Sequence, residues 1–165
     1  MAFLTRAAAS AAIAAVFMFP GAVHAQDALL DIEIGAFDPV ERDDEAVSFR
    51  LAWLSGKPLL WKIAPMAGAM ATTDGAVYGY GGLYADLFLT DNLFLMPSVA
   101  AGLYADGDGK DLGHAVQFRS GAMVGWRFDG GMRVGVSYHH LSNGGLGDRN
   151  PGVEILGFSL MLPLQ

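Results

Sequence analysis

Apolar and polar residues alternate with a period of two along most of the chain. From Ala28 to Pro163, helical periodicity is scarce, while alternating segments bounded by turn residues recur. Eight such segments are predicted as strands: Leu29–Phe37, Ala46–Leu54, Leu59–Ala71, Ala76–Leu89, Leu93–Tyr104, Ala115–Phe128, Met132–His140 and Val153–Leu162. The alternation therefore predicts an all-β chain.

The lengths of these segments and of their connections favour a barrel in a membrane. A tilted strand needs ~9–11 residues to cross the hydrocarbon, and small outer-membrane barrels have eight strands. Three connections are tight, at residues 55–58, 90–92 and 129–131, and three are longer and more polar, at residues 38–45, 105–113 and 141–152. Short periplasmic turns alternating with longer extracellular loops are typical of such barrels. The short turn at 72–75 does not follow this rule. We expect an eight-stranded antiparallel transmembrane β-barrel.

The segment 115–128 displays the two faces of the expected wall. One parity carries Val116, Phe118, Ala122, Val124, Trp126 and Phe128, and the other carries Gln117, Arg119, Gly121, Gly125 and Arg127. A soluble barrel would show the same alternation with its faces exchanged, so parity alone does not separate the two. For the lumen we expect charge partners, namely Arg50, Arg119, Arg127 and Arg133 with Glu33, Glu45 or Asp86. For the membrane interfaces we expect a girdle from Tyr78, Tyr80, Tyr84, Trp53, Trp61 and Trp126.

Composition tips this choice toward the membrane. The chain is 53% hydrophobic and only 16% charged, which is more apolar than an average soluble domain. After the first 25 residues there is no apolar run of about twenty, so a closed barrel is the form in which this chain would span a bilayer.

The first 25 residues have the organisation of a signal peptide. Arg6 gives a positive start, Ala7–Phe19 an apolar stretch, and Val23-His24-Ala25 a cleavage site. We expect residues 1–25 to be removed and residues 26–165 to form the barrel domain in a Gram-negative outer membrane. The mature chain then carries nine basic and 17 acidic residues, a net charge of −8 that makes nucleic acid an unsuitable partner.

Metal and cofactor motifs are absent from the sequence. There is no cysteine, no zinc-type cluster and no phosphate-binding glycine loop, so we expect neither metal nor cofactor. The aspartates 106, 108 and 111 are interleaved with glycines but lack the terminal bidentate glutamate of a calcium loop. Whether this loop, residues 105–111, binds a cation is left open.

Three residues near the end of the chain can form a hydrolytic triad. The parity of the segment 132–140 places His140 on the outer face and His139 in the lumen, and the parity of the last segment places Glu154 outside as well. Antiparallel pairing makes His140 and Glu154 neighbours at the rim, where a polar group facing the bilayer costs least. Ser142 follows two residues later. In such a set, Glu154 fixes the His140 tautomer and His140 accepts the Ser142 proton.

The connecting loop contains candidates for oxyanion stabilisation. Asn143, Asn150 and Gly145 could direct amide or backbone N–H groups at a developing negative charge. The same composition is also that of an ordinary hairpin loop, and for the loop glycines the two interpretations are equally balanced.

The sequence His140-x-Ser142-Asn143, followed by Asn150 and Glu154, closely resembles the lipid A 3-O-deacylases (PagL). The resemblance implies an eight-stranded outer-membrane barrel that hydrolyses the 3-O-linked acyl chain of lipid A, a component of lipopolysaccharide. It further implies a triad of His140, Ser142 and Glu154, an oxyanion role for Asn150, and a homodimer. Asn143 matches a second motif position without an assigned role. The motif covers about a tenth of the chain, which ends in Gln165 instead of the aromatic residue of many such barrels.

A second class of function remains open. The chain could be a non-enzymatic small barrel that stabilises the envelope or binds an apolar ligand. Replacement of Ser142, His140 or Glu154 separates the two, because a structural barrel has no deacylation to lose. A channel is the least favoured interpretation, since side chains normally fill an eight-stranded lumen.

Overall fold

The computed structural model describes residues 27–164, which form nine strands in one sheet. The strands are β1 (Ala28–Phe37), β2 (Ala46–Leu54), β3 (Ile63–Thr72), β4 (Val77–Ala85), β5 (Leu87–Phe88), β6 (Leu93–Ala105), β7 (Val116–Arg127), β8 (Arg133–Ser142) and β9 (Val153–Leu164). Both β4 and β5 pair with β6, and only Asp86 separates them. They are therefore one interrupted strand, and the wall has the eight strands that the sequence predicts.

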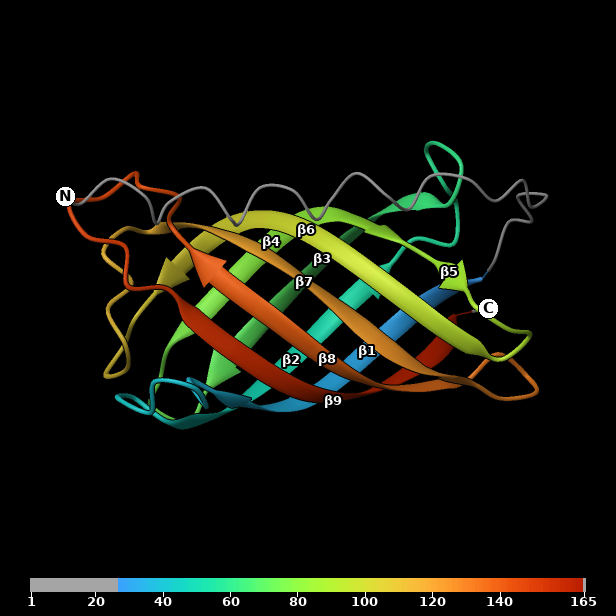
Figure 1. Ribbon diagram of the computed structural model, residues 1–165, viewed down its shortest axis with the longest axis horizontal. Coiled ribbons are helices and arrows are strands. Elements are labelled where there is room, and N and C mark those ends of the chain that lie inside the picture. Colours follow the sequence, from blue (N-terminus) through green and yellow to red (C-terminus); the bar gives the residue numbers. More distant parts are fainter. Residues whose placement is uncertain (1–26, 165) are drawn as a thin grey trace, which may run out of the picture.

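The sheet closes on itself. Consecutive strands pair in antiparallel fashion, β1 pairs with β9 as well as with β2, and β4 pairs with β6 (Figure 1). A closed ring leaves no strand edge with unpaired backbone groups, as a lipid environment requires. The prediction of an eight-stranded antiparallel barrel is confirmed. The described part of the chain contains no helix that is long and apolar enough to cross a bilayer.

The third strand begins four residues later than predicted. Leu59 and Leu60 lie in a turn in which both backbone N–H groups donate to the Ile63 carbonyl, and Trp61 has a positive φ of 52°. The sequence did not reveal this turn because its apolar residues continue the strand pattern. The two leucine side chains are exposed.

Charged residues fill part of the lumen. The Arg50 Nε atom donates to Glu33 at 2.9 Å, and another nitrogen of Arg50 lies 2.8 Å from Asp31. The hydroxyls of Ser137 and Ser159 donate to the same Glu33 carboxylate at 2.6 and 2.9 Å. This cluster joins β1 and β2 to β8 and β9 from the inside, so the lumen is a packed core and not a pore.

Of the residues predicted as interior charge partners, Arg50, Arg133, Glu33 and Asp86 form ion pairs in the lumen. Arg50 pairs with Glu33, and Arg133 pairs with Asp86 at 3.0 Å. Arg119 lies over the Tyr80 ring, and Arg127 donates to the Asp91 carbonyl oxygen. Glu45 instead pairs with Arg42 at the surface, because it lies in a loop where strand parity no longer determines the side of the wall.

The tyrosines of β4 were placed on the wrong face by the sequence argument. Tyr78, Tyr80 and Tyr84 are buried in the lumen, whereas Trp53 and Trp126 lie outside as expected. Glycines on the neighbouring strands make room for the rings: a Cβ at Gly68 would lie 2.6 Å from the Tyr80 hydroxyl. The tyrosine rings thus occupy the space left by glycines on the neighbouring strands. The pattern of a single strand does not reveal this fit.

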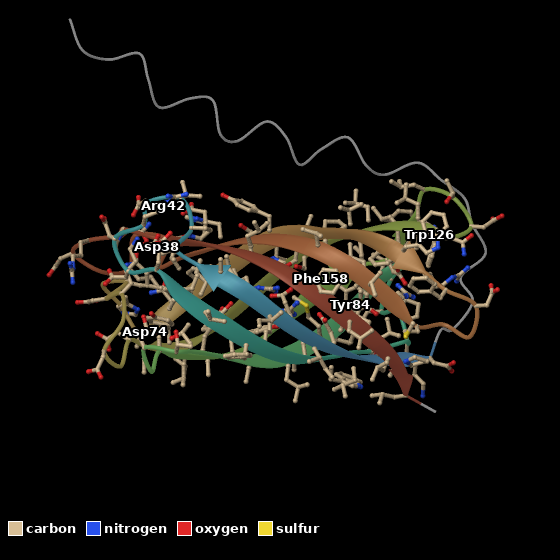
Figure 2. All side chains as sticks on the ribbon, turned by 90° about the horizontal axis from the view of Figure 1, so that it is seen from below. Asp38, Arg42, Asp74, Tyr84, Trp126 and Phe158 are labelled. Carbon is tan, nitrogen blue, oxygen red and sulfur yellow. The ribbon has the colours of Figure 1, made fainter. Side chains whose placement is uncertain are left out.

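The two ends of the barrel differ, as the connections predict. We call the end that carries the connections 38–45, 73–76, 106–115 and 143–152 the loop end, and the opposite end the turn end. Asp38, Arg42 and Asp74 gather at the loop end and Trp126 lies toward the turn end, with Phe158 on the wall between them (Figure 2). The outer wall exposes large apolar side chains on β1, β2, β4 and β6 to β9, and alanines on β3. An apolar outer face of this kind is typical of transmembrane barrels.

Candidate active site

A histidine and a glutamate face each other on the outer wall, at the loop end of β8 and β9. His140 is paired directly with Glu154 in the strand register. The His140 Nδ1 atom lies 3.0 Å from the Glu154 Oε1 atom, and both side chains are partly exposed. His139 is buried in the lumen. The parity of both strands thus places these three residues where the sequence predicts.

This contact determines which imidazole nitrogen can act as a base. A carboxylate only accepts hydrogen bonds, so the hydrogen of the 3.0 Å contact belongs to Nδ1 of His140. The neutral ring then has its lone pair on Nε2. Glu154 therefore holds His140 in the tautomer that a general base requires.

Ser142 is the last residue of β8. Since side chains two residues apart on a strand share a face, its hydroxyl lies on the same outer face as His140. The residue across from Ser142 on β7 is Phe118. Among residues 27–164 the Ser142 hydroxyl forms no hydrogen bond, either to His140, whose ring bonds to Glu154, or to any other group. In the absence of substrate, catalytic hydrogen bonds are often long and tighten only in the complex.

Asn143 organises the loop that follows β8. Its side chain is fully buried and donates to the carbonyl oxygens of Leu112 at 2.9 Å and Arg149 at 2.7 Å. Its Oδ1 atom accepts the backbone N–H of Gly145 at 2.8 Å. Asn143 therefore ties the loop 143–152 both to itself and to the loop 106–115.

The two other loop residues singled out from the sequence have different surroundings. The Gly145 N–H is occupied by Asn143, so Gly145 supports the loop. Asn150 is exposed, and its Oδ1 atom accepts the Asn143 N–H at 2.9 Å. That bond fixes the orientation of the Asn150 amide group. It uses only the amide oxygen, so the NH₂ group does not take part in it.

A buried lysine in the loop 106–115, Lys110, holds the loop 38–45, which in turn contacts the backbone of Glu154. The Lys110 ammonium donates to Asp38 at 3.0 Å and to Glu41 at 2.7 Å. Asp38, in turn, donates its backbone N–H to the Glu154 carbonyl oxygen at 2.9 Å. Burial opposes the charge of Lys110, but the bonds to Glu41 and Asp38 prevail and raise the pKa of the ammonium. The backbone beneath Glu154 is thus held by a loop that Lys110 anchors.

The loop acids do not form a metal site. In the stretch 27–164, no three histidine, cysteine or acidic side chains are arranged to hold a metal ion. Asp111 instead accepts the Gly113 N–H at 2.7 Å and contacts Arg149. The backbone bond from Gly113, and after it the Arg149 guanidinium, lower the pKa of Asp111.

Sequence reasoning missed several residues next to the site. Ser120 of β7 lies directly across from His140, and Phe118 lies across from Ser142. Leu112 and Asp38 reach the site through backbone atoms. The sequence showed the outward parity of Phe118 and Ser120, but it did not show the register between β7 and β8 that brings them beside Ser142 and His140.

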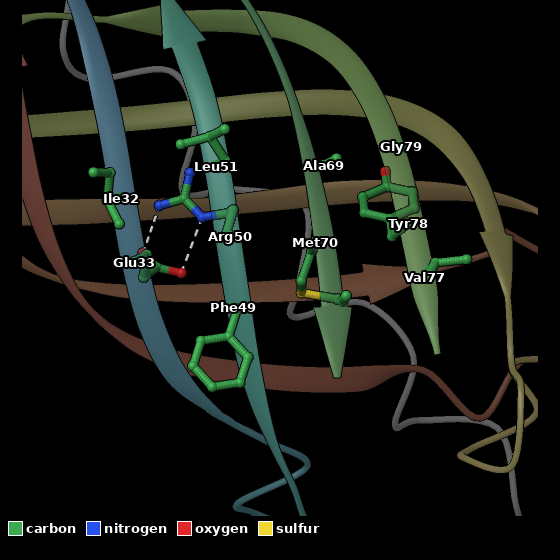
Figure 3. Close-up of a pocket in the computed structure, with 11 residues that line it drawn as sticks. Ile32, Glu33, Phe49, Arg50, Leu51, Ala69, Met70, Val77, Tyr78 and Gly79 are labelled. Atoms are coloured by element: carbon green, nitrogen blue, oxygen red, sulfur yellow. Dashed lines mark hydrogen bonds and ion pairs between the residues drawn. The ribbon is translucent and has the colours of Figure 1, made fainter. Parts of the chain in front are cut away.

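A separate hollow of about 460 Å³ opens on the outer wall over β1 to β4 (Figure 3). Ile32, Phe49 and Leu51 line it together with the small residues Ala69 and Gly79. His140, Ser142 and Glu154 do not line it, so the hollow is separate from the arrangement described above.

Comparisons with known proteins place this arrangement in a family. Residues 46–163 match the family model "Lipid A 3-O-deacylase (PagL)", which is more than half of the chain. The solved structure described as "Crystal structure of the outer membrane enzyme PagL" is similar with a TM-score of 0.66 and 21% identity, over 82% of this chain and 99% of that chain. A second, described as "De novo design of transmembrane beta-barrels", has a TM-score of 0.55 and 11% identity, over 84% and 98% of the two chains. At these identities the solved structures show the shared barrel fold. A search of curated proteins gave no match.

Proposed function

This chain belongs to the lipid A 3-O-deacylase (PagL) family, whose members are ester hydrolases, and on that premise we propose that His140, Ser142 and Glu154 are its catalytic triad. The observation that carries the proposal is the 3.0 Å contact between His140 Nδ1 and Glu154 Oε1 on the outer wall. A polar pair on a lipid-facing surface is costly and therefore points to a function.

The proposed reaction is the hydrolysis of the ester at the 3-position of lipid A. The Ser142 oxygen attacks the acyl carbonyl carbon while its proton passes to Nε2 of His140. The tetrahedral intermediate collapses, the bond to the sugar 3-oxygen breaks, and His140 returns the proton to that oxygen. Water, deprotonated by His140, then attacks the carbonyl carbon of the acyl-serine. The bond to the Ser142 oxygen breaks, and His140 returns the proton to that oxygen. The products are the free fatty acid and lipid A with a 3-hydroxyl group.

The loop 143–152 is proposed to stabilise the oxyanion of that intermediate. The proposed donor is the Asn150 amide; what supports it is the hydrogen bond from the Asn143 backbone N–H to Asn150 Oδ1, which fixes the orientation of that amide in the loop that follows β8. Asn143 and Gly145 support the loop through their own hydrogen bond. A donor that is held in place before the reaction avoids the cost of reorienting it during the reaction.

The position of the triad suits a substrate that stays in the membrane. His140 lies at the loop end of an apolar wall, where the acyl chains of lipid A can lie against the barrel while its sugars remain in the head-group region. We propose that the loop end is extracellular and that residues 1–25, which lie outside the described residues, are a signal peptide for export. A homodimer is proposed from the family resemblance.

Mass spectrometry of lipid A tests this function. Cells that express the chain should contain lipid A lacking one ester-linked acyl chain, and cells that express Ser142→Ala should not. The alternative, a structural or ligand-binding barrel, requires unchanged lipid A in both cultures. If Ser142→Ala still deacylates lipid A, the proposed nucleophile is wrong.

A further inference from the structure

The imidazole of His140 rests against the backbone of Gly152. An added Cβ at Gly152 would lie 2.8 Å from Cε1 and 3.3 Å from Nε2 of His140. Real Cβ atoms do not approach a ring carbon to 2.8 Å, so the present ring position requires the absence of a side chain at residue 152. Gly152 is itself buried.

The strand register explains why this one glycine lies beside the triad. His140 pairs with Glu154, and Leu141 pairs with Val153. The next step of the same register would bring Gly152 opposite Ser142. An added Cβ at Gly152 would therefore contact the His140 ring and, at 3.2 Å, the Leu141 carbonyl oxygen.

The backbone conformation of Gly152 supports the same conclusion. Its φ of 71° lies in the left-handed region, which residues with a Cβ adopt at a cost. Gly145 and Gly130 have comparable φ values of 86° and 87°, but an added Cβ would meet nothing within 4 Å at either position. The contact with an imidazole distinguishes Gly152 from these two.

We propose that Gly152 is a positioning residue for the deacylation reaction: its missing side chain seats the His140 ring, so that Glu154 holds one nitrogen and the other faces Ser142. This inference rests on the proposed triad. Any Cβ at residue 152 displaces the ring, since a ring at the end of a side chain moves more readily than the backbone beneath it. A base displaced by about 1 Å loses roughly 100-fold in rate.

The test uses Gly152→Ala, Gly152→Asn and the control Gly130→Ala. Asparagine tolerates a left-handed φ far better than alanine but still carries a Cβ, so the Asn variant relieves backbone strain and keeps the contact with His140. Gly130→Ala introduces the same φ strain at the turn end, away from the triad. Each purified barrel is first checked for folding by circular dichroism and by its mobility on unheated gels.

Two readouts follow the nucleophile and the reaction. The first is the rate at which an alkyl fluorophosphonate phosphonylates Ser142, with loss of fluoride; the second is kcat and KM on lipid A in mixed micelles. We expect both Gly152 variants to lose about 100-fold in labelling rate and in kcat with little change in KM. Gly130→Ala should match the wild type.

The outcomes separate this inference from the function on which it rests. If the wild type is labelled at Ser142 and Gly152→Ala is labelled equally fast, the positioning role is wrong and the triad stands. Recovery of activity in Gly152→Asn would assign the loss to backbone strain and would also overturn the proposal. If the wild type neither labels at Ser142 nor deacylates lipid A, the proposed function fails and this inference fails with it.

Discussion

His140 Nδ1 lies 3.0 Å from Glu154 Oε1 across the directly paired strands β8 and β9. The pair needs no loop to bring it together, because the register of two rigid strands sets the separation of the residues. A site built on strands holds its geometry more precisely than one built on loops. The tautomer of the proposed base therefore depends on the wall of the barrel itself.

Glu154→Gln should remove most of the activity while the barrel remains folded. The Gln amide can donate to Nδ1 of His140, which places the ring hydrogen on Nε2 and removes the base. We expect kcat to fall by about 10³- to 10⁴-fold at neutral pH. Release of fatty acid from lipid A measures the change, and near-normal turnover by Glu154→Gln would show that Glu154 does not set the tautomer.

Asn143→Ala should loosen the loop 143–152. It leaves the Leu112 and Arg149 carbonyls and the Gly145 N–H without their partner, at about 1–3 kcal/mol for each buried group left unpaired. Hydrogen exchange should accelerate in the loops 106–115 and 143–152 and stay unchanged at the turn end. Exchange at the wild-type rate would mean that other contacts hold the loop.

Lys110→Met should release the loop 38–45, because it leaves the buried Asp38 carboxylate without its cation. We expect the free energy of local opening to fall by about 3 kcal/mol, measured by hydrogen exchange, with exposed Lys57→Met as the control. A double-mutant cycle with Asp38→Asn should give a non-zero coupling. If the effects of Lys110→Met and Asp38→Asn simply add, the Lys110–Asp38 ion pair does not hold the loop.

The stabilisation of the loop 38–45 by the Lys110 contacts with Asp38 and Glu41 should also be lost at alkaline pH. Because the neighbouring acids raise the pKa of Lys110, its stabilisation is fully present below the ordinary lysine value of about 10.4 and is lost as the pH rises through the higher folded value. Exchange of the loop 38–45 should therefore increase steeply above that range, and Lys110→Met should lack this step.

The contact between Asp111 and Arg149 has the opposite pH dependence. The pKa of Asp111 is lowered, so its contribution is present above the ordinary aspartate value of about 3.9 and is lost as the pH falls through the lowered value. Pepsin should cut the loop 143–152 increasingly as the pH falls, after correction for its activity on an unfolded peptide. Asp111→Asn should be cut readily across the whole range, and equal resistance of both chains would exclude this role.

Glu33→Ala should destabilise the barrel without changing the chemistry. It removes the carboxylate that binds Arg50, Ser137 and Ser159 in the lumen, and breaking a buried ion pair costs about 3–5 kcal/mol. Urea unfolding in lipid vesicles measures the loss. Turnover per folded molecule should remain at the wild-type level, because the proposed triad lies on the other side of the wall.

The sequence predicted the number of strands and the outward face of β7, β8 and β9. It could do so because successive side chains of a strand point to opposite sides of the barrel wall, so apolar and polar residues alternate with a period of two. It did not predict the interruption at Asp86 or the turn at Trp61, where apolar residues continue through a break. It also placed Tyr78 and Tyr80 outside. Their rings fit glycines on adjacent strands, and that complementarity is a property of pairs of strands.

For the candidate site, the sequence was sufficient where one hairpin determines the geometry. His140 and Glu154 belong to consecutive strands, so parity and antiparallel pairing were enough. Asp38 and Leu112 reach the site from distant loops through backbone atoms, whose positions no side-chain pattern encodes. The proposed role of Gly152 likewise depends on the His140 ring lying against its backbone, a contact between two strands that no pattern along one strand predicts.

The packed lumen has a kinetic consequence for the proposed reaction. With Arg50, Tyr80 and their neighbours filling the interior, neither lipid A nor the released acyl chain can travel through the barrel. Both must arrive and depart by lateral diffusion along the leaflet. The turnover of this enzyme should accordingly follow the surface density of lipid A in the membrane, and dilution with inert lipid should slow it even when the amounts of enzyme and lipid A in the sample are unchanged.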